Sequence, residues 1–168
     1  MPNIYLVGFM GTGKTEVAKL LAKHLKCLHV DMDEAIEKRQ NMSITEIFKS
    51  RGEAYFRRLE KELVAELSAK DGVVVACGGG TFVDPENIVA LKKSGTVVCL
   101  SSTPGTILKR TSCFKNRPLL NVDNPKAVLE ELLEKRMPFY AQAHYMVDAD
   151  KLTVEETAEE IKKLLKLL

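Results

Sequence analysis

The sequence lacks the features that would place it in several protein classes. Its four cysteines include no C-x-x-C pair, so we expect free thiols in a reducing cytoplasm rather than a disulfide framework or a zinc site. No apolar run approaches the roughly 18 residues of a membrane-spanning helix, and the N-terminus shows no signal-peptide pattern. Lysine and arginine number 25 against 23 aspartates and glutamates, a balance that argues against a dedicated nucleic-acid binder.

The remaining composition is that of a globular domain. Hydrophobic residues make up 45% of the 168 positions and charged residues 29%, which favours one domain spanning residues 1–168 that works as a monomer without nucleic-acid or membrane partners. Short β-branched runs alternate with longer amphipathic runs, the pattern of an α/β fold. We expect strands at 3–7, 27–31, 73–76, 96–100 and 145–147, and helices at 14–25, 33–39, 53–69, 104–110, 124–144 and 153–168. Capping boxes of Ser43 with Glu46 and of Thr153 with Glu156, and an N-cap at Asp84, also mark helix starts.

The first loop carries the most specific motif. Residues Gly8 to Thr15 read GFMGTGKT and match G-x-x-x-x-G-K-[ST] between an expected strand and an expected helix. Glycines allow backbone N–H groups to converge on phosphate oxygens, and the helix N-terminus adds partial positive charge. Lys14 can reach the β- and γ-phosphates, and the Thr15 hydroxyl can bind Mg²⁺. The alternative is an ordinary glycine-rich turn, which would not need this motif.

Two carboxylates, Asp31 and Asp33, follow the second expected strand. In an extended segment both would lie on the same side, at the carboxyl edge of the sheet where open α/β sheets bind ligands. One can hold Mg²⁺ through water and the other can accept a proton from a hydroxyl group. The alternative is that Asp33 only caps the following helix, which would leave Asp31 without a role.

Glycines and arginines elsewhere provide candidates for a small-molecule site. Gly78, Gly79 and Gly80 follow the third strand and would let a ligand lie against backbone amides, although a flexible turn is the alternative. Arg57 or Arg58 near the start of a helix opposes its dipole, so an anionic ligand is one explanation and a solvated or ion-paired arginine is the other. Glu60 is spaced to orient Arg57. Arg136 either points to the site or lies on the surface.

A long stretch without acidic residues extends from Asn87 through Val122 and includes a loop of about a dozen residues before Asn124. Its cations are Lys92, Lys93, Lys109, Arg110, Lys115 and Arg117. We expect a lid over about residues 111–124 that neutralises phosphate charge and excludes water. A solvated charge run is the alternative.

Together, the phosphate loop, Asp31-Met32-Asp33, Gly52-Glu53 with Phe56-Arg57 and Glu60, Gly78-Gly79-Gly80, Arg117-Pro118-Leu119-Leu120, and Arg136 with Pro138 and Tyr140 resemble the shikimate kinase family over nearly the whole chain. The resemblance implies a three-layer fold like that of nucleoside-monophosphate kinases, with a five-stranded parallel sheet flanked by helices and a mobile lid. It also implies ATP-dependent phosphorylation of the 3-hydroxyl group of shikimate, in the pathway to chorismate and the aromatic amino acids.

The resemblance also implies residue roles. Asp33 corresponds to the base, with Lys14 and Arg117 as the other catalytic residues and Arg117 in the lid. The nucleotide site would comprise Gly11, Thr12, Gly13, Lys14, Thr15, Glu16, Arg110 and Arg117. The shikimate site would comprise Asp33, Arg57, Gly78, Gly79, Gly80 and Arg136, within a substrate-binding segment of about residues 32–60. Thr15 and Asp31 would hold Mg²⁺.

Two other functions stay open on the sequence. One is a different small-molecule kinase, such as a gluconate or nucleotide kinase. The other is a non-catalytic nucleotide-dependent binding module, which would predict a damaged phosphate loop or a missing carboxylate, whereas both are intact here.

Overall fold

The computed structural model describes residues 1–112 and 122–167 and contains one five-stranded parallel sheet. The strands run in the order β2-β3-β1-β4-β5. Their bounds are β1 Asn3–Val7, β2 Leu28–Asp31, β3 Val73–Ala76, β4 Gly95–Ser101 and β5 Tyr145–Asp148. Every pairing is parallel. The expected α/β class, the five strands and the parallel sheet are therefore confirmed.

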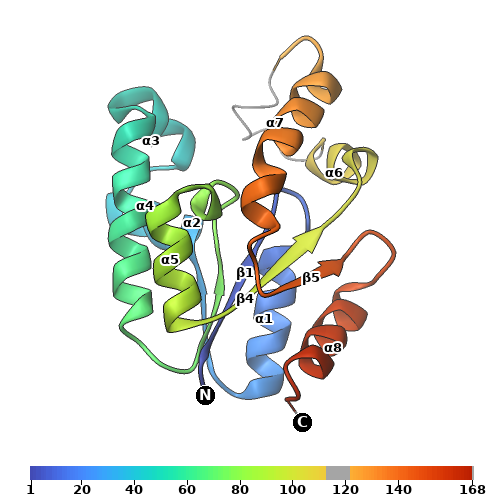
Figure 1. The fold of residues 1–168 in the computed structure, drawn as a ribbon. Coiled ribbons are helices and arrows are strands. Elements are labelled where there is room, and N and C mark those ends of the chain that lie inside the picture. The colour runs from blue at the N-terminus through green and yellow to red at the C-terminus, as the bar shows by residue number, and fades with distance from the viewer. Residues whose placement is uncertain (113–121, 168) are drawn as a thin grey trace.

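Helices cover both faces of the sheet and form three layers (Figure 1). Alternate residues of β1 face opposite layers because side chains alternate along a strand. Ile4 and Leu6 pack with α1 (Lys14–Leu25) and α8 (Val154–Leu164). Tyr5 and Val7 pack in the opposite layer, whose helices are α2 (Met32–Gln40), α3 (Ile44–Arg51), α4 (Glu53–Ser68), α5 (Pro85–Ser94), α6 (Pro104–Thr111) and α7 (Pro125–Tyr140).

The strand order places the functional loops together. The connection after β1 runs to β2, while the connection after the neighbouring strand β3 runs in the opposite direction to β4. Ligands of α/β sheets bind at the carboxyl ends of two strands whose connections diverge in this way. Asp31 at the end of β2 is level with Ala76 at the end of β3. The phosphate loop, Asp31 and the glycine cluster (Gly78–Gly80) therefore meet at one edge of the sheet. Figure 1 shows both chain termini at the opposite end of the molecule.

Side-chain caps set most helix starts where the sequence predicted them. Ser43 with Glu46, and Thr153 with Glu156, form complete capping boxes at α3 and α8. Asp84 caps α5 by accepting from two backbone N–H groups. Such caps require only residues within one helical turn, so the sequence reveals them directly.

Two helices end earlier than their patterns predicted. α7 stops at Tyr140 rather than near 144, because His144 joins the sheet: its Nδ1 accepts from Val97 N at 3.0 Å and its N–H donates to Val97 O at 3.0 Å. α8 stops at Leu164, since Lys166 adopts a left-handed conformation with φ 53°. In the part of the chain that the structure describes, no helix is both long and apolar enough to cross a membrane.

Candidate active site

The phosphate loop takes its shape from glycines with positive φ. Gly8, Gly11 and Gly13 have φ of 134°, 77° and 89°, a region that side chains disfavour. At Gly8 a Cβ would also overlap the Leu100 carbonyl on β4, so the loop packs directly against the sheet. The Thr12 hydroxyl donates to Phe9 O at 2.8 Å and closes the loop from within.

Lys14 opens α1 and turns its side chain back over the loop. Its ammonium donates to the carbonyls of Gly8 at 2.9 Å and Phe9 at 2.8 Å, and the residue is buried. The loop backbone thus holds the cation at the helix N-terminus, where phosphate oxygens bind. The side chain of Glu16 is exposed and pairs with Lys19 at 3.4 Å, which leaves its backbone N–H in the first turn as the group that can serve a phosphate.

Thr15 and Asp31 lie together, as a shared metal site requires. Thr15 Oγ1 donates to Asp31 Oδ2 at 2.6 Å, which joins the start of α1 to the end of β2. The other oxygen, Oδ1, accepts from Glu34 N at 3.1 Å and makes Asp31 the N-cap of α2. The capping role considered for Asp33 therefore belongs to Asp31.

Asp33 reaches the same edge by a different route from the one that the sequence suggested. Met32 begins α2, so Asp33 lies in a helical first turn and the premise of an extended segment was wrong. A Cβ built on Gly78 would lie 2.9 Å from Asp33 Oδ1 and 2.8 Å from Glu60 Oε1. Both carboxylates thus approach a glycine that no side chain could replace without displacing them.

Arg57, rather than Arg58, belongs to the site. Its guanidinium binds Glu60 Oε2 at 2.5 Å and Glu53 Oε1 at 3.2 Å, and it lies directly against Gly80. Burial alone would lower the pKa of Arg57, but the carboxylates of Glu60 and Glu53 raise it above its ordinary value. Arg58 is exposed and pairs with Glu62 at 3.8 Å.

Glu60 and Thr81 connect Arg57 to the glycine cluster. Glu60 is 1% exposed, and its Oε1 accepts from the hydroxyl of the fully buried Thr81 at 2.7 Å. Asn87 on α5 donates to Thr81 O at 3.0 Å. A buried carboxylate thus has partners on both oxygens, as burial of a charge requires. The sequence suggested Glu60 as a partner of Arg57 but gave no sign of Thr81 or Asn87.

Arg136 approaches the same cluster from α7. Its NH1 donates to Gly79 O at 3.3 Å, and its guanidinium lies over the Phe9 ring at 5.3 Å from the centroid. The Tyr140 hydroxyl donates to the same Gly79 carbonyl at 2.5 Å. Burial raises the pKa of Tyr140 to about 12, while the charges of Arg136 and Arg57 oppose that rise. Arg136 is therefore half-buried against the glycine cluster, and its role in binding an acceptor stays a prediction.

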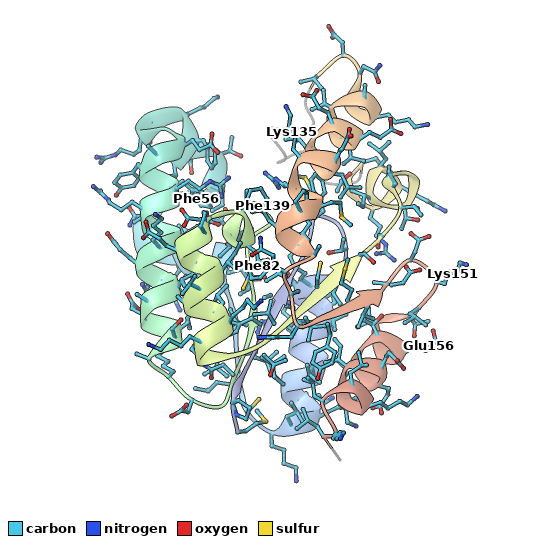
Figure 2. The ribbon with its side chains drawn as sticks, in the orientation of Figure 1. Phe56, Phe82, Lys135, Phe139, Lys151 and Glu156 are labelled. Atoms are coloured by element: carbon cyan, nitrogen blue, oxygen red, sulfur yellow. The ribbon has the colours of Figure 1, made fainter. Side chains whose placement is uncertain are left out.

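Aromatic side chains pack beneath the two arginine-bearing helices. Phe56 of α4 and Phe82 of η1 (Thr81–Val83) belong to one buried cluster, and Phe139 of α7 packs against it (Figure 2). The Phe56 ring also lies 5.4 Å from the Arg57 guanidinium carbon. This apolar support fixes the two helices so that both arginines reach consecutive glycines.

The cations of the stretch without acidic residues, Asn87 to Val122, contact different parts of the molecule. Arg110 on α6 donates to Gly11 O and Ala149 O, both at 3.3 Å, and so links the phosphate loop to the segment after β5. Lys92 instead donates to Gln142 O at 2.7 Å, on a surface between α5 and the residues after α7. Arg117, and most of the segment predicted as a lid, lie outside the described residues.

The arrangement of metal-ligating side chains bears on metal binding. Within residues 1–112 and 122–167, no three His, Cys, Asp or Glu side chains group closely enough to hold a metal by themselves. The Thr15–Asp31 oxygen pair is a partial site, of the kind that a cation shared with bound phosphates would use.

Comparisons with known proteins indicate one family. A family model described as shikimate kinase matches residues 10–166. The shikimate kinase of Thermodesulfovibrio yellowstonii is 48% identical over 163 residues, covering 97% of this chain and 94% of that protein. A shikimate kinase of Thermus thermophilus is 47% identical over 163 residues, covering 96% of this chain and 89% of that protein.

Solved structures give the same result. The shikimate kinase from Acinetobacter baumannii in complex with shikimate superposes with a TM-score of 0.95 at 40% identity, covering 99% of this chain and 93% of that one. A gluconokinase from Sinorhizobium meliloti reaches a TM-score of 0.63 at 16% identity over 99% of this chain and 93% of that one, which shows a common fold and no more.

Proposed function

The chain belongs to the shikimate kinase family, and we propose that it transfers the γ-phosphoryl group of ATP to the 3-hydroxyl group of shikimate. This reaction serves the biosynthesis of chorismate and the aromatic amino acids. The observation that carries the proposal is the convergence of two arginines on consecutive glycines beside an aspartate, at the sheet edge that also carries the phosphate loop.

The acceptor site fits a small hydroxylated carboxylate. Arg57 lies against Gly80 and Arg136 bonds to Gly79 O, so their guanidinium groups come from α4 and α7 to neighbouring backbone positions. Guanidinium forks bind carboxylates bidentately, and bare glycine backbone lets a ring lie against peptide groups. A nucleotide acceptor would instead need a pocket for its base.

Asp33 is the proposed base. Its carboxylate lies against Gly78, one residue before the glycines that the two arginines approach, so it can accept a hydrogen bond from a hydroxyl of the bound acceptor. Phosphoryl transfer passes through a loose transition state, in which orientation and charge stabilisation matter more than early deprotonation. Asp33 therefore orients the attacking hydroxyl group and takes its proton late.

The donor site is built from the phosphate loop. Backbone N–H groups of Gly11, Thr12 and Gly13, with those of the first turn of α1, cradle the phosphates. Lys14 exchanges its hydrogen bonds with Gly8 and Phe9 for phosphate oxygens. Arg110 contacts both the phosphate loop and Ala149, which follows β5. We assign it to the adenosine end of the bound ATP. The assignment of Arg117 to the lid stays a prediction.

An ATP-using kinase implies a metal associated with the nucleotide, and we assign it as Mg²⁺. The donor set fits, because Thr15 and Asp31 present only oxygen atoms, which hard cations prefer. When bound, such a cation neutralises charge on the β- and γ-phosphates. Thr15 would bind it directly and Asp31 through water.

The proposal also covers the oligomeric state, the location and the domain organisation of the protein. We assign a monomer in the cytoplasm, a single kinase domain with its substrate-binding segment at about residues 32–60 and its lid at about 111–124. The support is the near-neutral charge and the single five-stranded sheet. Sedimentation of the purified chain at micromolar concentration tests the monomer.

A coupled assay of ADP release tests the function. We expect ATP consumption that depends on shikimate and is absent with gluconate or nucleoside monophosphates. A gluconate-dependent rate would favour the fold-related gluconokinases, and nucleotide binding without turnover of any acceptor would favour a non-catalytic module.

The Asp33→Asn variant tests the base. It keeps the size of the side chain and removes the proton acceptor, so we expect unchanged ATP binding and a kcat lower by about 10²–10⁴-fold. Thermal unfolding should be measured alongside, to show that the variant is folded. Near-normal turnover in a folded Asp33→Asn protein would remove Asp33 as the base.

A further inference from the structure

Tyr140 is a buried phenol whose hydrogen bond reaches into the acceptor site. It is 1% exposed at the end of α7, and its hydroxyl donates to Gly79 O at 2.5 Å. Burial raises its pKa to about 12, so the phenol stays protonated and remains a donor throughout the pH range in which a cytoplasmic enzyme works. The roles assigned above to Arg57, Arg136 and Asp33 do not use it.

Tyr140 and Arg136 share one acceptor. They lie four residues apart on α7, so both side chains project from the same face of the helix to the Gly79 carbonyl. A carbonyl oxygen has two lone pairs and can accept from both. The two bonds differ, because the phenol donates at 2.5 Å and the Arg136 guanidinium at 3.3 Å. Tyr140 is thus the closer donor and Arg136 the more distant one.

This difference matters when a carboxylate binds. Arg136 must turn its fork toward the anion, and this charge-assisted pairing is stronger than a long bond to a neutral carbonyl. A half-buried carbonyl left without a donor would oppose the movement, because an unmade hydrogen bond costs free energy. With Tyr140 in place, the carbonyl keeps a partner while the guanidinium moves.

The same bond also sets the direction of a peptide group. The Gly79–Gly80 peptide is trans, as all described peptides are, so its N–H points opposite to its carbonyl. Because the carbonyl faces α7, the Gly80 N–H faces away from α7. Neither glycine has a side chain that would otherwise restrict the rotation of this peptide.

We propose that Tyr140 is a positioning residue that anchors the Gly79 carbonyl, so that Arg136 is released to bind the carboxylate of the acceptor. This inference rests on the proposed function, since it assigns Arg136 to that carboxylate. It adds a role for a phenol that acts through the Gly79 carbonyl.

The test replaces Tyr140 by phenylalanine, which keeps the ring and removes only the hydroxyl group. Arg136 then becomes the remaining donor to Gly79 O, so acceptor binding has to break that bond. We expect the KM and the calorimetric Kd for shikimate to rise about three- to tenfold, the value of one neutral hydrogen bond. The KM for ATP should stay within twofold of the wild-type value.

Tyr5→Phe is the matched control. The Tyr5 ring is also fully buried, and its hydroxyl bonds to Ser94 Oγ at 2.8 Å and accepts from Asn3 Nδ2 at 2.9 Å, in a different part of the core. Both variants therefore lose a buried hydroxyl group and should unfold at a lower temperature. Only Tyr140→Phe should change the shikimate constants.

A double-mutant cycle with Arg136→Ala separates positioning from simple stabilisation. If Tyr140 acts through Arg136, the loss in kcat/KM for shikimate caused by Tyr140→Phe should disappear in the Arg136→Ala background. An undiminished loss in that background, or unchanged shikimate constants in Tyr140→Phe, would overturn the inference alone. A wild-type protein that neither binds nor phosphorylates shikimate would overturn the proposed function, and this inference with it.

Discussion

Replacing Gly80 by alanine should displace Arg57 without straining the backbone. Gly80 has φ −100°, which any residue adopts, so the effect must come from the added methyl group. That Cβ would lie 2.7 Å from NH2 and 2.8 Å from Cζ of Arg57. Ordinary contact begins at 3.4 Å, so Cζ has to retreat from 2.8 Å by about 0.6 Å.

The guanidinium of Arg57 cannot move away freely, because other residues already bind it. Glu60 binds it at 2.5 Å and is itself fixed by Thr81, while Glu53 binds it at 3.2 Å. A shift of this size would misplace one of the two N–H groups with which the Arg57 guanidinium binds the carboxylate of the acceptor. Misplacement on the order of 1 Å can cost about 10²-fold in rate, and a hydrogen bond to a charged group contributes about 1.5–3 kcal/mol. We therefore expect kcat/KM for shikimate to fall by about 10- to 100-fold.

The assay is steady-state ADP release with shikimate and ATP varied separately. The KM for ATP should change less than twofold, because the three atoms nearest to the methyl group all belong to Arg57. Gly105→Ala is the control, since a Cβ on that glycine in α6 meets nothing within 4 Å. A folded Gly80→Ala protein with a wild-type KM for shikimate would refute the assignment of Arg57 to the acceptor.

Three further changes have expected outcomes elsewhere in the chain. Arg136→Ala should mainly raise the KM for shikimate, and an unchanged value in steady-state kinetics would contradict its assignment. Asn3→Ala should lower the free energy of unfolding by about 3 kcal/mol in urea titrations with little change in either KM, because the buried amide bonds to backbone groups around the end of α4 and the start of β3. Burial raises the pKa of the Cys77 thiol well above its ordinary value. It also raises the pKa of Cys99 to about 11, so at pH 8 only about one in a thousand Cys99 side chains is thiolate. Iodoacetamide followed by peptide mapping should therefore leave both unlabelled until the pH approaches 11 or the protein unfolds, and rapid labelling at pH 8 would show that they are accessible.

The sequence was sufficient wherever a feature depends on neighbouring residues. The phosphate loop needs eight consecutive positions between a strand and a helix, and both capping boxes need four. The alternation of strands and helices has the same local origin, so the predicted elements are found with shifts of a few residues at their ends. The resemblance to a family then supplied the parallel sheet and the list of site residues.

Two predictions made from the local sequence pattern were wrong. Asp31 and Asp33 were expected on one side of an extended segment, yet a helix begins at Met32 and Asp31 caps it. The end of α7 was placed too late, because nothing near His144 shows that it will pair with β4. The partner of His144 is Val97, which lies far away in the sequence, so the local pattern could not show this contact. The partner of Asp31 is the Glu34 N–H, three residues away, so the local pattern contained this cap and the prediction assigned it to the wrong aspartate.

What the sequence alone determined is the chemistry available: a phosphate loop, two aspartates, a glycine cluster and several arginines. Only the tertiary structure decided that the Arg57 guanidinium lies against Gly80, and that Tyr140 and Arg136 share the Gly79 carbonyl. The reason is that these contacts join segments more than 20 residues apart, and the order of strands in the sheet brings them together. Spacing along a chain fixes which side chains lie on one helix face, but it does not fix what that face meets.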